Sequence, residues 1–427
     1  MNKWTRGVSI IGAAYSHFGN VLETPEIKGM TYWELLATAA LGALENAGIT
    51  PKDVDSLLVN QVQTQTVQTL TTNAVAAHWL GMTQKPSVRY ETACSSGASG
   101  IRLAGSMIAS GIDDIVLIVG AEILNSVGVE KENEFRKQPG IRQPIDRHYQ
   151  SEIIMDCWDQ AYIQPLTLGG TGITSPLFAY ADRYGVTFDQ LDEARNAAAI
   201  NLRRNAARNP KAMLRTEYKD IAKEAGFSDE REYLRSPQFN PFVNTITRIS
   251  QFYVPADGAA ALVLCASEDA KKYTKTPVDV IGIGAASGSP YSTDPYALPP
   301  ETSAFDQAYK MANLNPKDID YLGLHDVLVE QHIYTSEKAG YFEPGESWRA
   351  IIEGRTAFDG DKPINTHGGC PSMGNVYGIS GITEIGEAVL QMKGECGDRQ
   401  IRPPKIAVTH AMGGGPSYGV TVLQRRD

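Results

Sequence analysis

The sequence has few cysteines, no long apolar run and no surplus of basic charge. Its five cysteines are scattered without a C-x-x-C pair, which fits a reducing cytosol better than a disulfide framework or a zinc site. The first apolar run is short and broken by serine and glycine, which predicts neither a signal peptide nor a membrane span there. A formal charge of -10 argues against nucleic acid and anionic membranes as partners. These absences predict a cytoplasmic protein of enzyme size that needs no metal.

What the chain does contain is a regular alternation of predicted strands and helices over 427 residues. Apolar runs predict strands at 8–14, 55–62, 88–91, 114–119, 256–266, 278–284, 319–324, 363–365, 405–409 and 418–423. Helical spacing predicts helices at 31–47, 70–80, 97–109, 302–312, 327–339 and 377–393. Both halves therefore run β-α-β-α-β-α-β-β. This order predicts an α/β fold with mainly parallel sheets between helical layers.

The two halves also share an internal repeat. Segments 45–59 and 310–324 read ENAGITPKDVDSLLV and KMANLNPKDIDYLGL, with six identities in fifteen positions. A Pro-Lys-Asp turn alone could arise by chance, but these matches occupy equivalent places in the same strand order. We therefore predict two homologous halves whose helices are shared in the middle.

One cysteine stands at a position suited to chemistry. Cys94 follows the predicted strand 88–91 and precedes the predicted helix 97–109. The unpaired N–H groups and the helix dipole at such a turn lower a thiol pKa and offer donors to an oxyanion, which makes Cys94 a candidate nucleophile. A small residue packed under a turn explains this stretch equally well, because most cysteines are inert core residues.

Several segments, taken in order, resemble motifs of the thiolase superfamily, in particular its sterol-carrier-protein-type and archaeal-type branches. They are ETACSSGASGI at 91–101, YGVTFDQLDEARNAAAINLRRNAARNPKA at 184–212, YVPADGAAALVL at 253–264, HDVL at 325–328, NTHGGCPSMGNVYGISG at 365–381 and AMGGG at 411–415. The resemblance covers nearly the whole chain. It implies a duplicated thiolase fold in a five-layered αβαβα arrangement with an inserted loop domain.

The same resemblance implies the division of the chain. Residues 1–122 and 250–266 would form the N-terminal half, 123–249 the inserted loop domain that binds CoA and the acyl group, and 267–427 the C-terminal half. It also implies a homodimer with the nucleophile strands near the interface, and a small partner that combines an OB fold with a zinc ribbon.

Two motif positions depart from the family. Asn375 stands where Gly-His-Pro has the histidine that activates the cysteine, and Ala411 stands where many thiolases have a second cysteine. An asparagine can donate a hydrogen bond to a thioester oxygen, but it accepts no proton at neutral pH. The usual general base is therefore missing.

Candidates for the replacement base lie in the motif segments. His325, His367 and His410 lie in segments that converge on the site in relatives, and a histidine titrates near neutral pH. Each could instead be a structural histidine bonded to backbone carbonyls. Cys370 and Tyr377 are further alternatives, provided that their neighbours lower the pKa of the thiol or phenol.

The inserted region carries features expected of a CoA-binding domain. Five cations fall on or near one predicted helix, where a 3′-phosphate and a pyrophosphate would bind, although a solvated helix face would look the same. They are Arg203, Arg204, Arg208, Lys211 and Arg215. Segment 130–174 is unlike common thiolases, and its aromatic residues are candidates for lining an acyl pocket or for packing. They include Tyr149, Trp158 and Tyr162.

The resemblance implies thiolase chemistry with CoA as co-substrate and no permanent cofactor. Cys94 would take the acyl group from a bulky, aromatic 3-oxoacyl-CoA, for example benzoylsuccinyl-CoA in anaerobic aromatic breakdown. The N–H groups of Cys94 and Gly413 would hold one oxyanion, and His325 with Asn375 the other. The alternatives are a thiolase-fold retro-aldol lyase, biosynthetic Claisen condensation and a non-catalytic subunit.

Overall fold

The computed structural model describes residues 4–62, 71–125, 171–242, 246–288, 294–413 and 417–426. Within them, nine strands join in the order β3-β2-β4-β5-β1-β6-β9-β8-β7. Their bounds are β1 Val8–Tyr15, β2 Ser56–Asn60, β3 Ser87–Tyr90, β4 Ile115–Glu122, β5 Gly258–Ala266, β6 Val278–Ser287, β7 Tyr321–Leu324, β8 Ile406–Gly413 and β9 Ser417–Arg425. The β1–β6 pairing joins the strands of the two halves.

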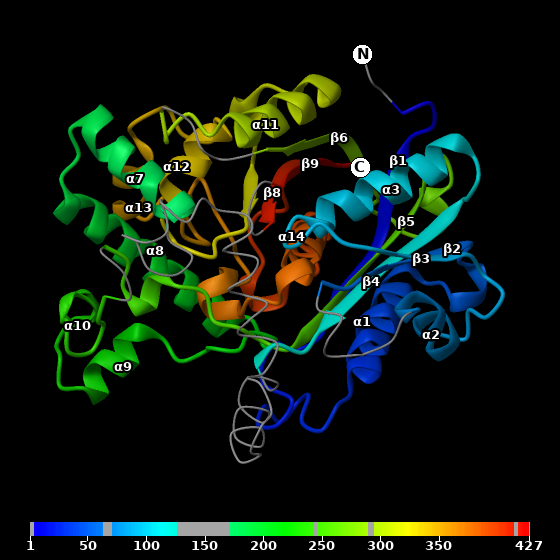
Figure 1. Ribbon diagram of the computed structural model, residues 1–427, viewed down its shortest axis with the longest axis horizontal. Helices are drawn as coiled ribbons and strands as arrows, with labels where there is room; N and C mark the ends of the chain where they lie inside the picture. The colour runs from blue at the N-terminus through cyan, green and yellow to red at the C-terminus, as the bar shows by residue number, and fades with distance from the viewer. Residues whose placement is uncertain are drawn as a thin grey trace, which may run out of the picture.

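Helices connect the strands and cover their faces (Figure 1). Their bounds are α1 Tyr32–Ala47, α2 Thr72–Trp79, α3 Ser96–Ser110, α7 Thr171–Tyr184, α8 Phe188–Arg208, α9 Tyr218–Glu224, α10 Glu230–Arg235, α11 Pro299–Ala312, α12 Gln331–Lys338, α13 Ser347–Ile352 and α14 Tyr377–Lys393. Local sequence fixes their ends. For α1, Thr31 and Glu34 form a capping box, and Gly48 ends the helix at φ 68°.

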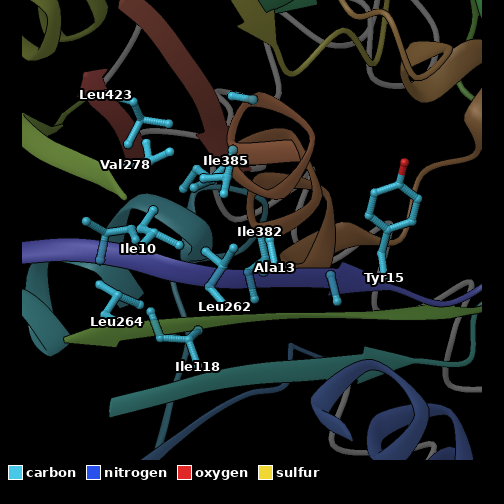
Figure 2. Close-up of a cluster of buried hydrophobic side chains, with 14 of the residues drawn as sticks. Ile10, Ala13, Tyr15, Ile118, Leu262, Leu264, Val278, Ile382, Ile385 and Leu423 are labelled. Atoms are coloured by element: carbon cyan, nitrogen blue, oxygen red, sulfur yellow. The ribbon is translucent and has the colours of Figure 1, made fainter. Parts of the chain in front are cut away.

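Helices α3 and α14 form the central layer between the two groups of strands. Figure 2 shows Ile382 and Ile385 of α14 beside Leu262 and Ala13 of the N-terminal strands. A second cluster packs α1 and α2 on the outer face of those strands, and a third packs α11 on the outer face of the C-terminal strands. The predicted succession of five layers is confirmed.

Two details of the predicted sheet are wrong. Among the strand pairs of the described residues, β2–β3, β2–β4 and β7–β8 are parallel, and the other five pairs are antiparallel. The strands at the middle of the sheet and those that close each half run against their neighbours, so the sheet is mixed. Segment 363–365 is not a strand, because its pairing stops at one bridge between Leu322 and Ile364.

The internal repeat has a structural reason. Asp55 accepts hydrogen bonds from the N–H groups of Asp114 and Ile115 at the start of β4, both at 2.9 Å. Its counterpart Asp320 accepts from Lys405 and Ile406 at the start of β8, at 2.8 and 3.0 Å. The shared aspartate therefore anchors the equivalent strand in each half.

Helices α7 and α8, which lie between β4 and β5, pack on the C-terminal half. Buried Glu337 of α12 accepts hydrogen bonds from the hydroxyl groups of Tyr180 and Tyr296, each at 2.8 Å, and from the backbone N–H of Ser347 at 3.0 Å. The domain boundaries given above remain a prediction. None of the helices in the described ranges is long and apolar enough to cross a membrane.

Candidate active site

Cys94 lies in a tight turn between β3 and α3. It is buried, with 8% of its surface exposed, and it directly precedes Ser95, the N-cap of α3. The turn is held by the Ser96 hydroxyl, which accepts from the Thr92 N–H at 3.0 Å, and by Ser95, whose hydroxyl donates to the Thr92 carbonyl at 2.7 Å. The thiol is therefore placed where the sequence predicted, at the N-terminal end of a buried helix.

Glycines allow three backbones to meet at this turn. A Cβ atom on Gly381 of α14 would lie 2.6 Å from the Cys94 carbonyl oxygen, and one on Gly97 would overlap the Gly381 backbone. A Cβ atom on Gly413, at the end of β8, would overlap the Thr92 carbonyl. Predicted site residue Gly413 therefore lies against the Cys94 turn, as does the start of α14.

Residues 253–254, which precede β5, hydrogen-bond to both the HDVL segment and the 365–375 segment. The Tyr253 N–H donates to the Val327 carbonyl at 2.9 Å, and the Val254 N–H donates to the Cys370 carbonyl at 3.2 Å. The Asn375 N–H donates back to the Val254 carbonyl at 2.7 Å. This pairing holds the HDVL segment and the 365–375 segment side by side.

Tyr253 is a site residue that the sequence did not predict. It lies near the thiols of Cys94 and Cys370 and hydrogen-bonds Tyr377, and burial raises the pKa of its phenol. Tyr377 has a φ of 24°, an unusual value for a residue other than glycine. The only available signal was the YVPADG motif itself, because a tyrosine just before a strand has no periodicity to mark it.

His325 meets Asn375 as predicted. It is 1% exposed, and within the described residues neither ring nitrogen makes a hydrogen bond of normal geometry, although Asn375 is its polar neighbour. Burial lowers the pKa of His325 to about 4, and Asp326 opposes this effect. The imidazole is therefore neutral at physiological pH, with one N–H to offer to a ligand oxygen.

The Asn375 side chain is oriented by its neighbours. Its Oδ1 accepts from the Ser380 hydroxyl at 2.7 Å and from the Cys370 thiol at 3.8 Å. With the oxygen engaged, the amide nitrogen is the group left to donate. Burial raises the pKa of Cys370 well above its usual value, and the charges of Asp326 and Glu384 raise it further, so this thiol stays protonated.

The structure corrects the placement of His410. Its Nε2 lies 3.0 Å from Oε1 of Glu301, and its ring stacks on Phe305 at 5.4 Å. Since side chains alternate along β8 and Gly413 faces the Cys94 turn, His410 points to the opposite face, toward α11. His410 contributes to the site only through its carbonyl, which accepts from the His325 N–H at 3.0 Å.

His367 pairs with a buried carboxylate. Its Nε2 lies 3.2 Å from Oε1 of Glu384, and both side chains are 2% exposed or less. The structure therefore places His367 in a buried ion pair with α14. Residue 384 had not been recognised from the sequence.

The five predicted phosphate ligands are not brought together. Arg203 is buried and donates to the Ser372 and Tyr218 hydroxyls, both at 3.1 Å, so its position is structural. Lys211 donates to the Tyr15 carbonyl at 2.6 Å, and Arg204 pairs with Glu230. That leaves two of the five for a phosphate, namely Arg208, which lies over the Phe358 ring, and exposed Arg215.

Part of the predicted pocket cannot be placed. Tyr149, Trp158 and Tyr162, with Gly414 and Gly415 of the AMGGG turn, lie outside the described residues. In the described part of the chain no cluster of three or more metal-binding side chains occurs, so the absence of a metal remains a prediction.

Family models match both halves of the chain. The thiolase N-terminal domain matches residues 8–268, and the thiolase C-terminal domain-like model matches residues 291–426. An acetyl-CoA acetyltransferase from Methanothermobacter thermautotrophicus is 30% identical, with 98% of this chain and 100% of that protein covered. The benzoylsuccinyl-CoA thiolase subunit BbsB of Thauera aromatica is 26% identical, with 77% of each chain covered.

Among solved structures, the Ltp2-ChsH2(DUF35) aldolase superposes with a TM-score of 0.75 at 21% identity, over 99% of this chain and 98% of that one. At this identity the likeness shows the fold alone. Together with the site, the family matches define a CoA-dependent acyltransferase of mixed α/β architecture. The chain belongs to the thiolase family. As predicted, it is a thiolase-type acyltransferase with coenzyme A as co-substrate.

Proposed function

We propose that this thiolase cleaves a bulky 3-oxoacyl-CoA by transferring its acyl group to Cys94 and then to CoA. The observation that carries the proposal is the convergence of Gly381 and Gly413 on the Cys94 turn, with the His325 imidazole, which makes no hydrogen bond of normal geometry among the described residues, close to Asn375. A nucleophile, backbone donors and a neutral side-chain donor are the parts that thiolytic cleavage of the C2–C3 bond of a 3-oxoacyl-CoA needs.

In the first step the Cys94 thiolate attacks the 3-keto carbon, and the N–H groups of Cys94 and Gly413 stabilise the alkoxide. The alkoxide collapses, the C2–C3 bond breaks, and its electrons form the enolate of an acyl-CoA. The N–H of His325 and the amide of Asn375 stabilise the enolate oxygen. CoA-SH then releases the acyl group from Cys94 as a second thioester.

Proton transfer is assigned to the phenols that lie near Cys94. Tyr253 has the raised pKa of a group that stays protonated, so it suits delivery of a proton to the enolate carbon. The proton that the Cys94 thiol gives up on forming the thiolate restores the Tyr253 phenol, which lies near that thiol. The proton of CoA-SH returns to Cys94 when the acyl group leaves. Cys370 is the remaining alternative for the role of the absent second cysteine.

An aromatic substrate is proposed from the relationship to benzoylsuccinyl-CoA thiolase subunit BbsB, which has that substrate in its name. The departures at Asn375 and Ala411 set this chain apart from the family motif. Biosynthetic condensation would use the same residues in reverse, so the direction of the reaction depends on concentrations.

Two protein contacts are part of the proposal. Strand β3 lies at the edge of the sheet, and its Val88 side chain is 52% exposed, which suits a homodimer formed along this edge. A small OB-fold and zinc-ribbon partner is proposed because BbsB is named as a subunit and because the aldolase pairs Ltp2 with a DUF35 protein.

A retro-aldol lyase is the second candidate, and the replacement of the activating histidine by Asn375 favours it. An aldol cleavage needs no acyl-enzyme, so Cys94 would then be dispensable. A non-catalytic subunit would need none of these groups.

The test is a product assay with linear, branched and aromatic 3-oxoacyl-CoA esters, with and without CoA and any co-purified partner. Cys94→Ala should lower CoA-dependent cleavage by about 10³-fold or more. Cys265→Ala, which removes a buried thiol on β5, is the matched control and should retain activity. Equal activity in the two variants would replace the thiolase mechanism with the aldol one.

A further inference from the structure

Three buried carboxylates lie behind the site, and each has a different set of partners. Glu387 of α14 accepts from Arg399, Tyr15, Thr366 and Gln391, and Arg399 contributes to holding the pKa of Glu387 at about 2 against the cost of burial. Asp326 accepts from Asn365 and the Cys370 N–H, both at 2.7 Å, and lies 2.8 Å from His332. Both carboxylates are ionised at physiological pH.

Glu384 differs because His367 is its single partner among the described residues. The free oxygen, Oε2, makes no hydrogen bond there, and neither does Nδ1 of His367. Burial raises the pKa of Glu384 to about 7, against the charge of His367. Burial lowers the pKa of His367, but the surrounding carboxylates outweigh this effect and raise it overall. Of the three carboxylates, Glu384 is therefore the one that titrates near neutrality.

The pair joins two elements that meet at the nucleophile. His367 belongs to the segment that continues through Cys370 to Asn375. Glu384 lies one helical turn beyond Gly381, whose Cα packs against the Cys94 carbonyl. A force between His367 and Glu384 therefore acts between the Asn375 segment and the helix that supports Cys94.

We propose that the His367–Glu384 ion pair positions Asn375 against Cys94, and that its loss when Glu384 takes up a proton sets the acidic limit of Cys94 reactivity. The proposal rests on the assigned role of Cys94. His367 and Glu384 are assigned as positioning residues, because the His367 ring is engaged by the Glu384 carboxylate and the pair acts through Asn375.

The direction of the pH effect follows from the charge states of Glu384 and His367. Above about pH 7 Glu384 is ionised and attracts protonated His367, and below it the carboxyl is neutral and the ion pair becomes a hydrogen bond. The pH range in which the ion pair exists ends, on the alkaline side, at the raised pKa of His367. Groups that bear on the pair from the surrounding elements are Tyr321, Asp326, Cys370 and Glu387. His332 and Arg399 act on two of these groups, Asp326 and Glu387.

The test measures the rate at which iodoacetamide alkylates Cys94 between pH 5.5 and 9, located by peptide mass mapping, so it requires no turnover. In the wild type we expect the alkylation rate to fall below about pH 7. In Glu384→Gln we expect this acidic limb of the rate–pH profile to shift by at least about one pH unit. Glu337→Gln, which alters a buried carboxylate of α12 that is hydrogen-bonded to Tyr180, should lower the melting temperature without shifting the limb. The same limb in wild type and Glu384→Gln would overturn the proposal.

A second measurement covers the case in which Glu384→Gln does not fold. Infrared difference spectra of the wild-type protein should show a buried carboxyl group that loses its proton as pH rises through 7. The absence of such a band would also overturn the proposal. Neither result depends on finding the substrate, so a failed activity assay would be a separate outcome.

Discussion

The two halves of this protein build equivalent turns from different chemistry. In the N-terminal half, β3 leads through Cys94 into α3, whose buried residues are serine, glycine, alanine and isoleucine. In the C-terminal half, segment 363–365 leads through a π-helical turn at Gly369–Met373 into α14, which buries Glu384, Glu387 and Gln391. The N-terminal copy of the repeat provides a nucleophile beside a helix whose buried side chains are uncharged, and the C-terminal copy provides the charges and the polar donors.

The contrast shows which parts of a duplicated fold can diverge. The anchoring aspartates, Asp55 and Asp320, keep the same role in both halves, because each secures a strand of the sheet. The central helices bury one face against each other, and the residues on that face are free to specialise as long as they pack. Gly97 and Gly381 make that packing close enough for the two chemistries to meet.

The largest effect in this comparison is expected on kcat/KM when His325, the side-chain donor of the C-terminal half, is replaced. Replacing His325 by glutamine should lower kcat/KM by about 10²- to 10³-fold, because the glutamine amide does not reproduce the preorganised position of the imidazole N–H. His410→Gln is the control, since His410 faces α11, and it should lower stability while leaving kcat/KM near the wild-type value. Steady-state kinetics and thermal unfolding of both variants check this pair. A larger kinetic loss in His410→Gln would reverse the assignment.

The contact between the halves can be tested at Gly381. Gly381→Ala places a methyl group 2.6 Å from the Cys94 carbonyl oxygen and should cost about 10²-fold in kcat by displacing the nucleophile. Gly386→Ala in the same helix meets no atom closer than 3.8 Å and should stabilise the protein by about 0.5–1 kcal/mol. Turnover and denaturant unfolding would show the two outcomes, and equal behaviour would mean that the Gly381 contact is unimportant.

The charged character of α14 predicts a specific pH dependence of stability. Because the folded pKa of Glu387 is about 2, its stabilisation is complete above the unfolded pKa and is lost as pH falls from about 4.5 toward 2. Glu387→Gln leaves Arg399 buried without its carboxylate and should cost about 3–5 kcal/mol at pH 7. Urea unfolding at pH 7 and at pH 3.5 should show a smaller difference between the two proteins at the lower pH. A constant difference would show that the charge of Glu387 is not responsible.

The smallest effect tests the feature that the halves share. Asp55→Asn and Asp320→Asn should each destabilise the protein by about 1–2 kcal/mol, because one charged acceptor of two N–H groups is lost. Unfolding midpoints of the two variants should agree. A loss in one variant alone would mean that the anchor has lost its function in the other half.

The sequence predicted the order of elements, the repeat and the position of Cys94, because these depend on local pattern. It did not predict the directions in which side chains point. His410 was misplaced although strand alternation from Gly413 would have sent it to the outer face. Arg203 was expected to meet a phosphate, but other segments cover α8 on several sides and take up its guanidinium. Tyr253 and Glu384 depend on contacts between distant segments, which no local pattern encodes.

The central claim is that the N-terminal half carries the acyl group on Cys94. The most direct measurement is intact-mass spectrometry with peptide mapping after brief exposure to the panel of 3-oxoacyl-CoA esters. We expect a mass increase of one acyl group on the peptide that contains Cys94, discharged by added CoA and absent in Cys94→Ala. Product formation by both proteins without any adduct would contradict the account and establish cleavage without an acyl-enzyme.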